Sequence, residues 1–184
     1  AGDAGARQAR PPARGGGARG RAREVRLPGG RAELPELQRQ AGAVRAVSPP
    51  VVLAHGDLKP SNVMRLDSGG LLLIDLELSG PNYRGFDLMK LFRADAGYSE
   101  AAFSRFLELY ASEVPGGAGV EALRAEAGLF EPLTWLEAAV FFALVVATQE
   151  GGERYAGLLR QRWERYLGVA DVTEHYAGKL AEMG

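Results

Sequence analysis

The chain has 184 residues, a formal net charge of −1 and no cysteine. The absence of cysteine excludes disulfides and thiol catalysis and fits a reducing compartment, so we expect a cytoplasmic protein. The near-neutral charge argues against a specific nucleic-acid partner for the folded part.

Residues 1–31 are dominated by glycine, alanine, proline and arginine, with a single valine and a single leucine. We expect this segment to stay disordered, because it cannot bury enough apolar surface to offset the entropy lost on ordering. Its arginines favour at most weak binding to nucleic acid or an anionic membrane. It lacks the apolar centre of a signal peptide. One folded domain with a single core is expected over residues 32–184.

The first part of that domain predicts a helix and three short strands. A helical segment covers 33–47, and the apolar run 51–54 is typical of a buried strand. The next strand is expected over 62–66, followed by turn residues at 67–70 and a returning antiparallel strand at 71–74. A small β-hairpin is therefore predicted just after the first strand.

The remainder is expected to be helical. The pattern predicts helices over 85–93, 100–112, 133–149, 155–167 and 171–183, with a Pro-Gly-Gly breaker at 115–117. The run 133–149 is apolar nearly all round, so we expect a buried central helix that is too short to span a bilayer, and hence no transmembrane segment. Trp135 and Trp163 are expected in the core. The predicted fold class is α+β, mostly helical.

The polar residues around the hairpin favour phosphotransfer chemistry. Residues 55–62 read His-Gly-Asp-Leu-Lys-Pro-Ser-Asn, and residues 73–77 read Leu-Ile-Asp-Leu-Glu. Phosphoryl transfer needs a positioned hydroxyl and metal ions that neutralise phosphate charge. Asp57 can accept or orient a hydroxyl, and the hairpin brings Asn62 and Asp75, both hard oxygen ligands suited to Mg²⁺, together. The alternative is that Asp57 and Asn62 only cap turns. His55 is expected to support the loop by hydrogen bonding.

These motifs resemble a known family. Gly56 and the run Ile-Asp-Leu-Glu depart from protein kinases and resemble the small-molecule kinases related to aminoglycoside phosphotransferases and choline kinases. Residues 82–87, Asn-Tyr-Arg-Gly-Phe-Asp, are similar to the segment that follows this motif in choline/ethanolamine kinases. The resemblance implies the C-terminal lobe of a kinase-like fold with a small catalytic β-hairpin. No glycine-rich nucleotide loop or strand lysine is found, so we expect that the N-terminal nucleotide lobe is absent and that the chain is a fragment.

The resemblance also implies roles for the site residues. It makes Asp57 the catalytic base with His55 in a supporting catalytic role. Lys59, Asn62 and Asp75 would bind the nucleotide, ATP. Mg²⁺ would be held by Asn62, Asp75 and Glu77. The implied reaction phosphorylates the hydroxyl of a small amino alcohol of the ethanolamine or choline type, in phospholipid head-group synthesis.

Some positions depart from the family. Relatives carry aromatic residues that cage a quaternary ammonium by cation–π attraction, whereas the matching positions here are Leu78, Ala143 and Val146. We therefore expect poor binding of choline and favour a smaller amine or another alcohol. For Asp87 we favour structural support of a helix start, and Arg84 fits a phosphate contact or a structural ion pair equally.

Two rival functions stay open from the sequence. One is an aminoglycoside phosphotransferase-like kinase that acts on another small alcohol. The other is a non-catalytic kinase-like fragment, whose support is the missing nucleotide lobe. The sequence leaves the oligomeric state undetermined.

Overall fold

The computed structural model describes residues 27–28, 34–114 and 118–183. The segment 1–31 that we expect to be disordered lies outside these residues except for Leu27 and Pro28, and so does the breaker at 115–117. In chain order the elements are α1 (Leu34–Val47), β1 (Val51–Ala54), η2 (Pro60–Asn62), β2 (Val63–Arg65), β3 (Leu71–Leu73), η3 (Leu76–Leu78), β4 (Gly80–Tyr83), α2 (Arg84–Phe92), η4 (Ala94–Ala96), α3 (Glu100–Glu113), α4 (Val120–Leu129), α5 (Glu131–Thr148), η5 (Gly152–Tyr155), α6 (Ala156–Gly168) and α7 (Val172–Met183), where η marks a 3₁₀ turn. The mostly helical α+β fold predicted from the sequence is confirmed.

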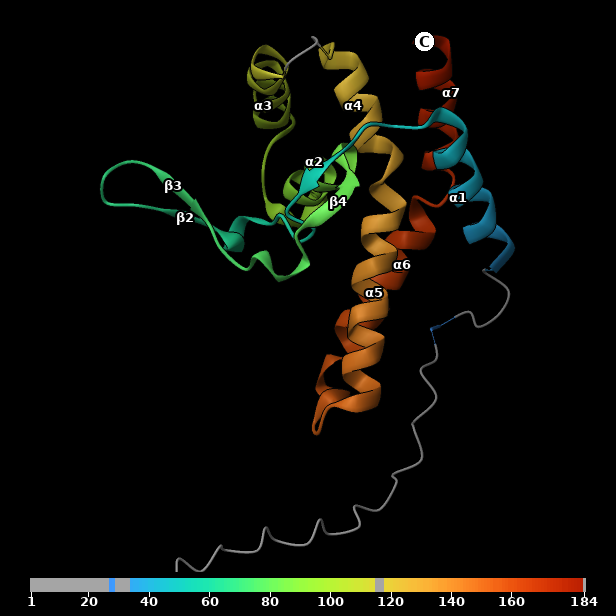
Figure 1. The fold of residues 1–184 in the computed structure, drawn as a ribbon. Coiled ribbons are helices and arrows are strands. Elements are labelled where there is room, and N and C mark those ends of the chain that lie inside the picture. Colours follow the sequence, from blue (N-terminus) through green and yellow to red (C-terminus); the bar gives the residue numbers. More distant parts are fainter. Residues whose placement is uncertain (1–26, 29–33, 115–117, 184) are drawn as a thin grey trace, which may run out of the picture.

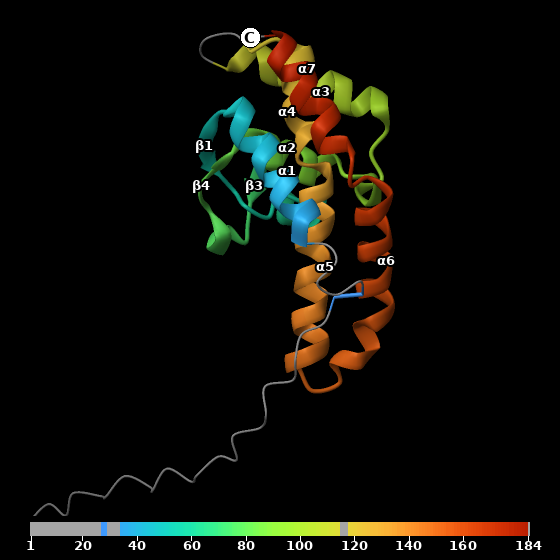
Figure 2. The ribbon, with the colours of Figure 1, turned by 90° about the vertical axis from the view of Figure 1, so that its right-hand side faces the viewer.

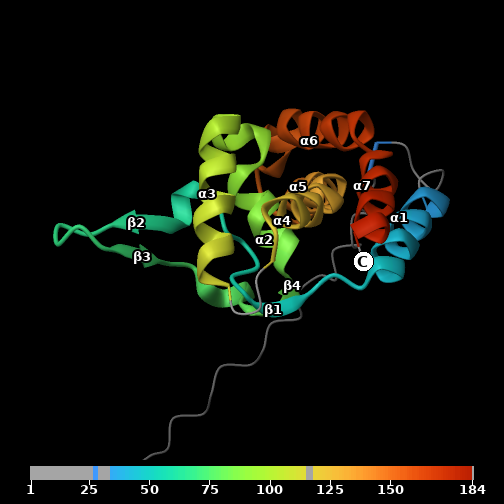
Figure 3. The same ribbon diagram turned by 90° about the horizontal axis from the view of Figure 1, so that it is seen from above.

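Helices α4 and α5 lie end to end and form the long axis of the fold (Figure 1). Phe130 joins them, and Pro132 in the first turn of α5 has no N–H to leave unsatisfied, as is usual where a helix begins. Helix α6 runs beside α5, while α7 packs on α4 and α1 packs on α7 (Figure 2). Helix α2 lies between α4 and the β1–β4 ribbon (Figure 3).

Two apolar clusters form the core. Phe130 lies in the first, together with residues of α1, α2, α3 and α4 such as Leu88, Leu107 and Leu123. The second lies between α5 and α6 and contains Trp135 and Trp163. The core positions predicted for the two tryptophans are therefore confirmed.

The helical run that contains α5 is longer than the sequence suggested. Because α4 leads into α5, the run Val120–Thr148 has 29 residues and is, by length and composition alone, long and apolar enough to cross a membrane. The prediction that this helix is too short to span a bilayer considered residues 133–149 only. Within the described residues this is the one such helix, and 44% of its most apolar window is buried inside the fold. That is weak evidence for a span, because a core helix meets the same criteria.

Burial along α5 and β1 differs from prediction. Phe141 and Leu144 of α5 are exposed, because α6 covers only one side of this part of the helix. In β1, Val51 and Leu53 are 59% and 85% exposed, whereas Ala54 is buried. The strand itself is confirmed, but its complete burial is wrong: a two-stranded ribbon packed on α2 has one covered face, so alternate residues point outward.

The strands form two separate antiparallel pairs. β1 pairs with β4, with Val51 opposite Tyr83 and Ala54 opposite Gly80. β2 and β3 form the predicted hairpin, which projects from the helical body (Figure 1). The loop after β1 therefore begins beside the strand that leads into α2, and the hairpin returns the chain to that loop.

Candidate active site

The loop that follows β1 is held by the carboxylate of Asp87. The backbone N–H of His55 donates to Oδ2 of Asp87 at 2.6 Å, and that of Gly56 donates to Oδ1 at 3.1 Å. Gly56 has φ +81°, and a Cβ there would lie 2.3 Å from the carbonyl oxygen of Leu78, so the position requires glycine. Asp87 thus has the structural role that we favoured, although it holds the loop rather than the start of its own helix.

His55 connects the loop to the end of the hairpin. Its buried ring contacts the carbonyl oxygen of Ile74 through Nε2 at 2.9 Å, and its Nδ1 accepts from the backbone N–H of Asp57 at 3.3 Å. With Nδ1 as an acceptor, this hydrogen-bond pattern corresponds to the tautomer in which Nε2 donates to Ile74. Both nitrogens are engaged within the loop, so the geometry supports a positioning role. A part for His55 in proton transfer stays a prediction.

The carboxylate of Asp57 is bound by two lysines. Nζ of Lys59 donates to Oδ2 at 2.6 Å, and Nζ of Lys90 lies 2.9 Å from Oδ1. Burial alone raises the pKa of Asp57, but the hydrogen bonds from Lys59 and Lys90 outweigh it, and the pKa lies below its ordinary value. Asp57 is therefore ionised at neutral pH and able to accept a hydrogen bond from a hydroxyl.

Lys90 is a site residue that sequence reasoning missed. Its side chain is only 5% exposed, and its Nζ lies 2.9 Å both from Asp57 and from Oε2 of Glu137 on α5. A signal was present: Lys90 follows Asp87 by three positions, which places both on one face of α2, toward the loop. The lysine therefore connects the predicted base to the helix that forms the far wall of the site.

The hairpin places the predicted metal ligands near Asp57. The backbone N–H of Ile74 donates to the carbonyl oxygen of Asn62 at 3.0 Å, so Ile74 lies opposite Asn62 and Asp75 is the next residue along the chain. The amide Nδ2 of Asn62 donates to the backbone oxygen of Asp57 at 3.0 Å and lies 3.3 Å from its carboxylate. The amide oxygen of Asn62, which accepts a long hydrogen bond of 3.5 Å from Oγ of Ser61, is the atom that can bind a cation.

Asp75 adopts a left-handed backbone conformation, with φ 65° and ψ 52°. Aspartate tolerates this region better than most residues, although the conformation costs about 1–2 kcal/mol. It turns the chain from β3 into η3, and both Asp75 and Glu77 line the same cavity as Asp57. The described residues contain no group of three or more His, Cys, Asp or Glu arranged to hold a metal. The donor set nevertheless fits Mg²⁺, which is usually bound by one or two carboxylates together with substrate phosphates.

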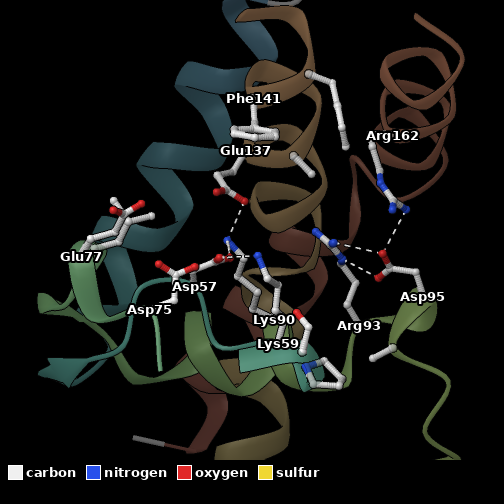
Figure 4. A pocket seen from close by; sticks show the side chains of 16 residues that line it. Asp57, Lys59, Asp75, Glu77, Lys90, Arg93, Asp95, Glu137, Phe141 and Arg162 are labelled. Carbon is white, nitrogen blue, oxygen red and sulfur yellow. Dashed lines mark hydrogen bonds and ion pairs between the residues drawn. The ribbon is translucent and has the colours of Figure 1, made fainter. Parts of the chain in front are cut away.

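The cavity has a volume of about 580 Å³ and two chemically different ends. Figure 4 shows Asp75 and Glu77 at one end, Asp57 and Lys90 in the middle, and Arg93, Asp95 and Arg162 at the other end. Lys59 and Asp57 line the same cavity, while Asn62 is buried beneath the loop.

Comparisons with known proteins show which sequences and folds this chain is similar to. The sequence profile of choline/ethanolamine kinases matches residues 29–116. A probable ethanolamine kinase of Arabidopsis thaliana is 45% identical over 67 residues, which are 36% of this chain and 17% of that protein. Over these stretches the sequence is similar to choline/ethanolamine kinases.

The fold is also similar to those of two solved members of the family. A choline/ethanolamine kinase family protein from Mesorhizobium loti matches with a TM-score of 0.66 and 19% identity, over 88% of this chain and 54% of that one. An ethanolamine kinase from Plasmodium vivax matches with a TM-score of 0.60 and 16% identity, over 77% of this chain and 40% of that one. The chain thus spans about half, or less, of the relatives that it matches.

The predicted positions of the family's aromatic cage need correction. Leu78 lines the cavity as expected, but Ala143 is buried between α5 and α6, and Val146 does not line the cavity. The side chains of α5 that line it are Glu137, Ala138, Phe141 and Phe142. Their spacing places them on one helical face, and Ala143 lies outside that face. Aromatic side chains therefore border the cavity, at positions other than those assigned from the sequence.

Arg84 forms a structural ion pair. Its Nε and NH2 donate to the two carboxylate oxygens of Glu126 on α4 at 2.9 and 2.6 Å, and both side chains are buried. The bidentate hydrogen bonding with Glu126 raises the pKa of Arg84 and outweighs the opposing effect of burial. Of the two roles left open by the sequence, the structure shows the ion pair. Arg84 does not line the cavity.

Proposed function

We propose that this chain carries the metal-binding and acceptor-binding side of a phosphotransferase. In the proposed reaction the γ-phosphoryl group of ATP moves to the hydroxyl of a small amino alcohol, as in the synthesis of phospholipid head groups. The supporting observation is that ionised Asp57 shares one cavity with Asp75 and Glu77 in a chain whose sequence is similar to choline/ethanolamine kinases. A purely structural loop does not need these carboxylates to face a common space.

In this proposal Asp57 accepts a hydrogen bond from the acceptor hydroxyl and orients it for attack. The carboxylate does not need a high pKa, because phosphoryl transfer depends mainly on positioning and charge stabilisation. Mg²⁺ would be held by the amide oxygen of Asn62 and by Asp75, with Glu77 beside them, and would neutralise charge on the phosphates.

Lys59 is the residue that we propose to contact the nucleotide phosphates. Its side chain is more exposed than that of Lys90, and its ion pair with Asp57 is at the cavity wall. Exchange of a carboxylate for a phosphate oxygen costs little at such a site, since the long side chain keeps its charge partnered. Lys90, being buried, would stay with Asp57.

We also infer that the chain corresponds to the lobe that carries the catalytic loop in its relatives. Its support is that 88% of the chain superposes on 54% of the Mesorhizobium loti protein. The elements that cover the nucleotide would then come from outside the matched part. The cytoplasmic location stays a prediction.

Calorimetric titration of the chain with ATP in the presence and absence of Mg²⁺ tests the metal site. We expect binding that depends on Mg²⁺ and is lost in Asp75→Ala. The matched control is Asp67→Ala, which removes an exposed carboxylate from the hairpin turn. Binding that Asp75→Ala leaves unchanged, or no Mg²⁺-dependent binding at all, contradicts the proposed metal site in this chain.

Phosphoryl transfer to ethanolamine and choline is the second test, with Asp57→Asn as the variant. This change keeps the size of the side chain but removes its charge, so we expect turnover to fall by at least about 100-fold, the lower range for a positioned acid–base group. Thermal unfolding of the same variant separates loss of catalysis from loss of fold. Substantial turnover in folded Asp57→Asn excludes the assigned role.

A further inference from the structure

The end of the cavity away from Asp75 and Glu77 is unusual for a site that receives an ammonium group. In the middle of the cavity and at this end, the basic side chains outnumber the carboxylates. The basic residues are Lys59, Lys90, Arg93 and Arg162, and the carboxylates are Asp57, Asp95 and Glu137. The fixed charge of these two parts together is therefore positive, and the far end by itself holds Arg93 and Arg162 against Asp95 (Figure 4).

Each of those carboxylates already has a cationic partner in the described structure. Asp57 is paired with Lys59 and Lys90, and Glu137 is paired with Lys90. Asp95 accepts from Nε of Arg93 at 2.8 Å and from NH1 of Arg162 at 3.0 Å. An ammonium ion that enters this end must compete with a fixed basic side chain for every carboxylate that it meets.

Each of the three nitrogens of the Arg93 guanidinium donates a hydrogen bond. Two of its nitrogens donate to Asp95, the third donates to the carbonyl oxygen of Thr134 at 2.8 Å, and the group lies 4.3 Å from the centre of the Trp135 ring. Its donors are therefore used to fix η4 against α5. Arg93 therefore shapes this end of the cavity.

Arg162 on α6 differs from Arg93. It shares Asp95 through one nitrogen, and its buried Nε has no hydrogen-bond partner within the described residues. Its side chain is 17% exposed and lines the cavity. Burial lowers the pKa of Arg162 more than Asp95 raises it, and the neighbouring Arg93 and Arg165 lower it further. The positive charge of Arg162 is thus incompletely compensated, and a bound anion would stabilise it.

We propose that the acceptor alcohol carries a carboxylate that binds Arg162, while its hydroxyl lies at Asp57. The inference rests on the proposed function and specifies its substrate class: among amino alcohols, the preferred acceptor is a hydroxy amino acid. A monoanion balances the excess positive charge, and guanidinium pairs with carboxylate through two parallel hydrogen bonds. A cavity of about 580 Å³ has room for such a molecule.

Matched pairs of small molecules test the proposal in the unmodified chain. Serine is ethanolamine with an added carboxylate, and serinamide has the same shape without the negative charge. Homoserine and 3-aminopropan-1-ol form a second pair with a longer spacer, in which the counterpart lacks the carboxylate altogether. We expect, by ligand-observed NMR titration, that at least one of the two hydroxy acids binds about tenfold or more tightly than its uncharged-carbonyl or carboxylate-free counterpart.

The variant Arg162→Gln is expected to remove that preference. The control is Arg165→Gln, which makes the same change on the same helix, near the same Trp135 ring, but outside the cavity lining. Arg162→Lys keeps the charge without the paired donors and should retain part of the preference. If Arg162→Gln does not fold, Arg162→Lys is used to test the carboxylate preference in its place.

Three outcomes overturn the proposal. The first is equal binding of serine and serinamide, and of the homoserine pair, in the unmodified chain. The second is a carboxylate preference that survives in folded Arg162→Gln. The third is a loss of Mg²⁺–ATP binding in Arg162→Gln without any change for the hydroxy acids, which would assign the arginine to a nucleotide phosphate. In each case, Mg²⁺–ATP binding by the unmodified chain that is lost in Asp75→Ala shows that the proposed function stands while the substrate class fails.

Discussion

Replacement of Lys90 by methionine is expected to destabilise the fold at neutral pH. Methionine is similar in length and unbranched, so the change removes the charge with little loss of volume. Lys90 contacts one oxygen of Asp57 and one of Glu137, both at 2.9 Å. A hydrogen bond between charged groups contributes about 1.5–3 kcal/mol to stability.

The two contacts do not contribute equally. The side chain of Glu137 is 42% exposed, so water can replace the lysine there. Asp57 is 18% exposed and keeps Lys59 as a partner, so it loses one of two cationic contacts. The expected loss in the free energy of unfolding is therefore about 2–3 kcal/mol, close to the value of one well-formed charged hydrogen bond.

The effect should depend on pH with a definite sign. Because the pKa of folded Asp57 lies below its ordinary value of 3.8, its ionisation stabilises the fold above that pH. This stabilisation is lost as the pH falls through the lower folded pKa. Since Lys90 is one cause of the lowered pKa, the difference between wild type and Lys90→Met should narrow below about pH 4.

Urea unfolding followed by far-ultraviolet circular dichroism, at about pH 7, 5, 4 and 3, measures this difference. The control is Lys179→Met on α7, where the lysine is exposed and a change within about 0.5 kcal/mol is expected. An unfolding free energy of Lys90→Met equal to that of the wild type at neutral pH refutes the reasoning. So does a difference that stays constant down to the lowest pH.

Two further changes probe the support of the loop. Gly56→Ala should lower stability by more than about 2 kcal/mol and disturb the Asp57 loop, because φ is +81° and the new Cβ would meet the carbonyl oxygen of Leu78 at 2.3 Å. The control is Gly69→Ala, because φ is also positive there but no atom lies within 4 Å of the new Cβ. A lower melting temperature of Gly56→Ala than of Gly69→Ala measures the effect of the steric clash, and equal melting temperatures argue against that clash. Glu126→Gln should cost about 3–5 kcal/mol, because Arg84 is left as an unpaired buried charge. The double variant Arg84→Met with Glu126→Leu should regain much of the lost stability, which urea unfolding measures. A double variant as unstable as Glu126→Gln counts against the unpaired charge as the cause.

The parts of the site that lie close together in the chain could be predicted from the sequence. The turn residues at 67–70 and the flanking apolar runs specify an antiparallel hairpin, and its geometry returns Asp75 to Asn62. Asp57 shares a cavity with Asp75 because the hairpin returns the chain to the loop that carries Asp57. These contacts depend on local turn chemistry, which a single sequence carries.

Contacts between distant helices could not be predicted in this way. Glu137 meets Lys90 because α5 packs across α2, and Arg162 meets Asp95 because α6 runs beside α5. Periodicity identifies the apolar side of a helix but does not name its neighbour. Helix α5 is apolar nearly all round, so its pattern does not define which face lines the cavity. The cage positions were assigned to Ala143 and Val146 from the family resemblance alone, whereas the face that lines the cavity contains Phe141.

Helix α2 explains why the segment from Asn82 to Asp87 accompanies the catalytic loop. Asp87 fixes the backbone of His55 and Gly56 from this helix, and one turn later Lys90 fixes the carboxylate of Asp57. The helix itself is anchored to α4 by Arg84 and Glu126. A shift of α2 would therefore move the loop backbone and the base carboxylate together, so the buried Arg84–Glu126 pair is expected to set the precision of the site although neither residue lines the cavity.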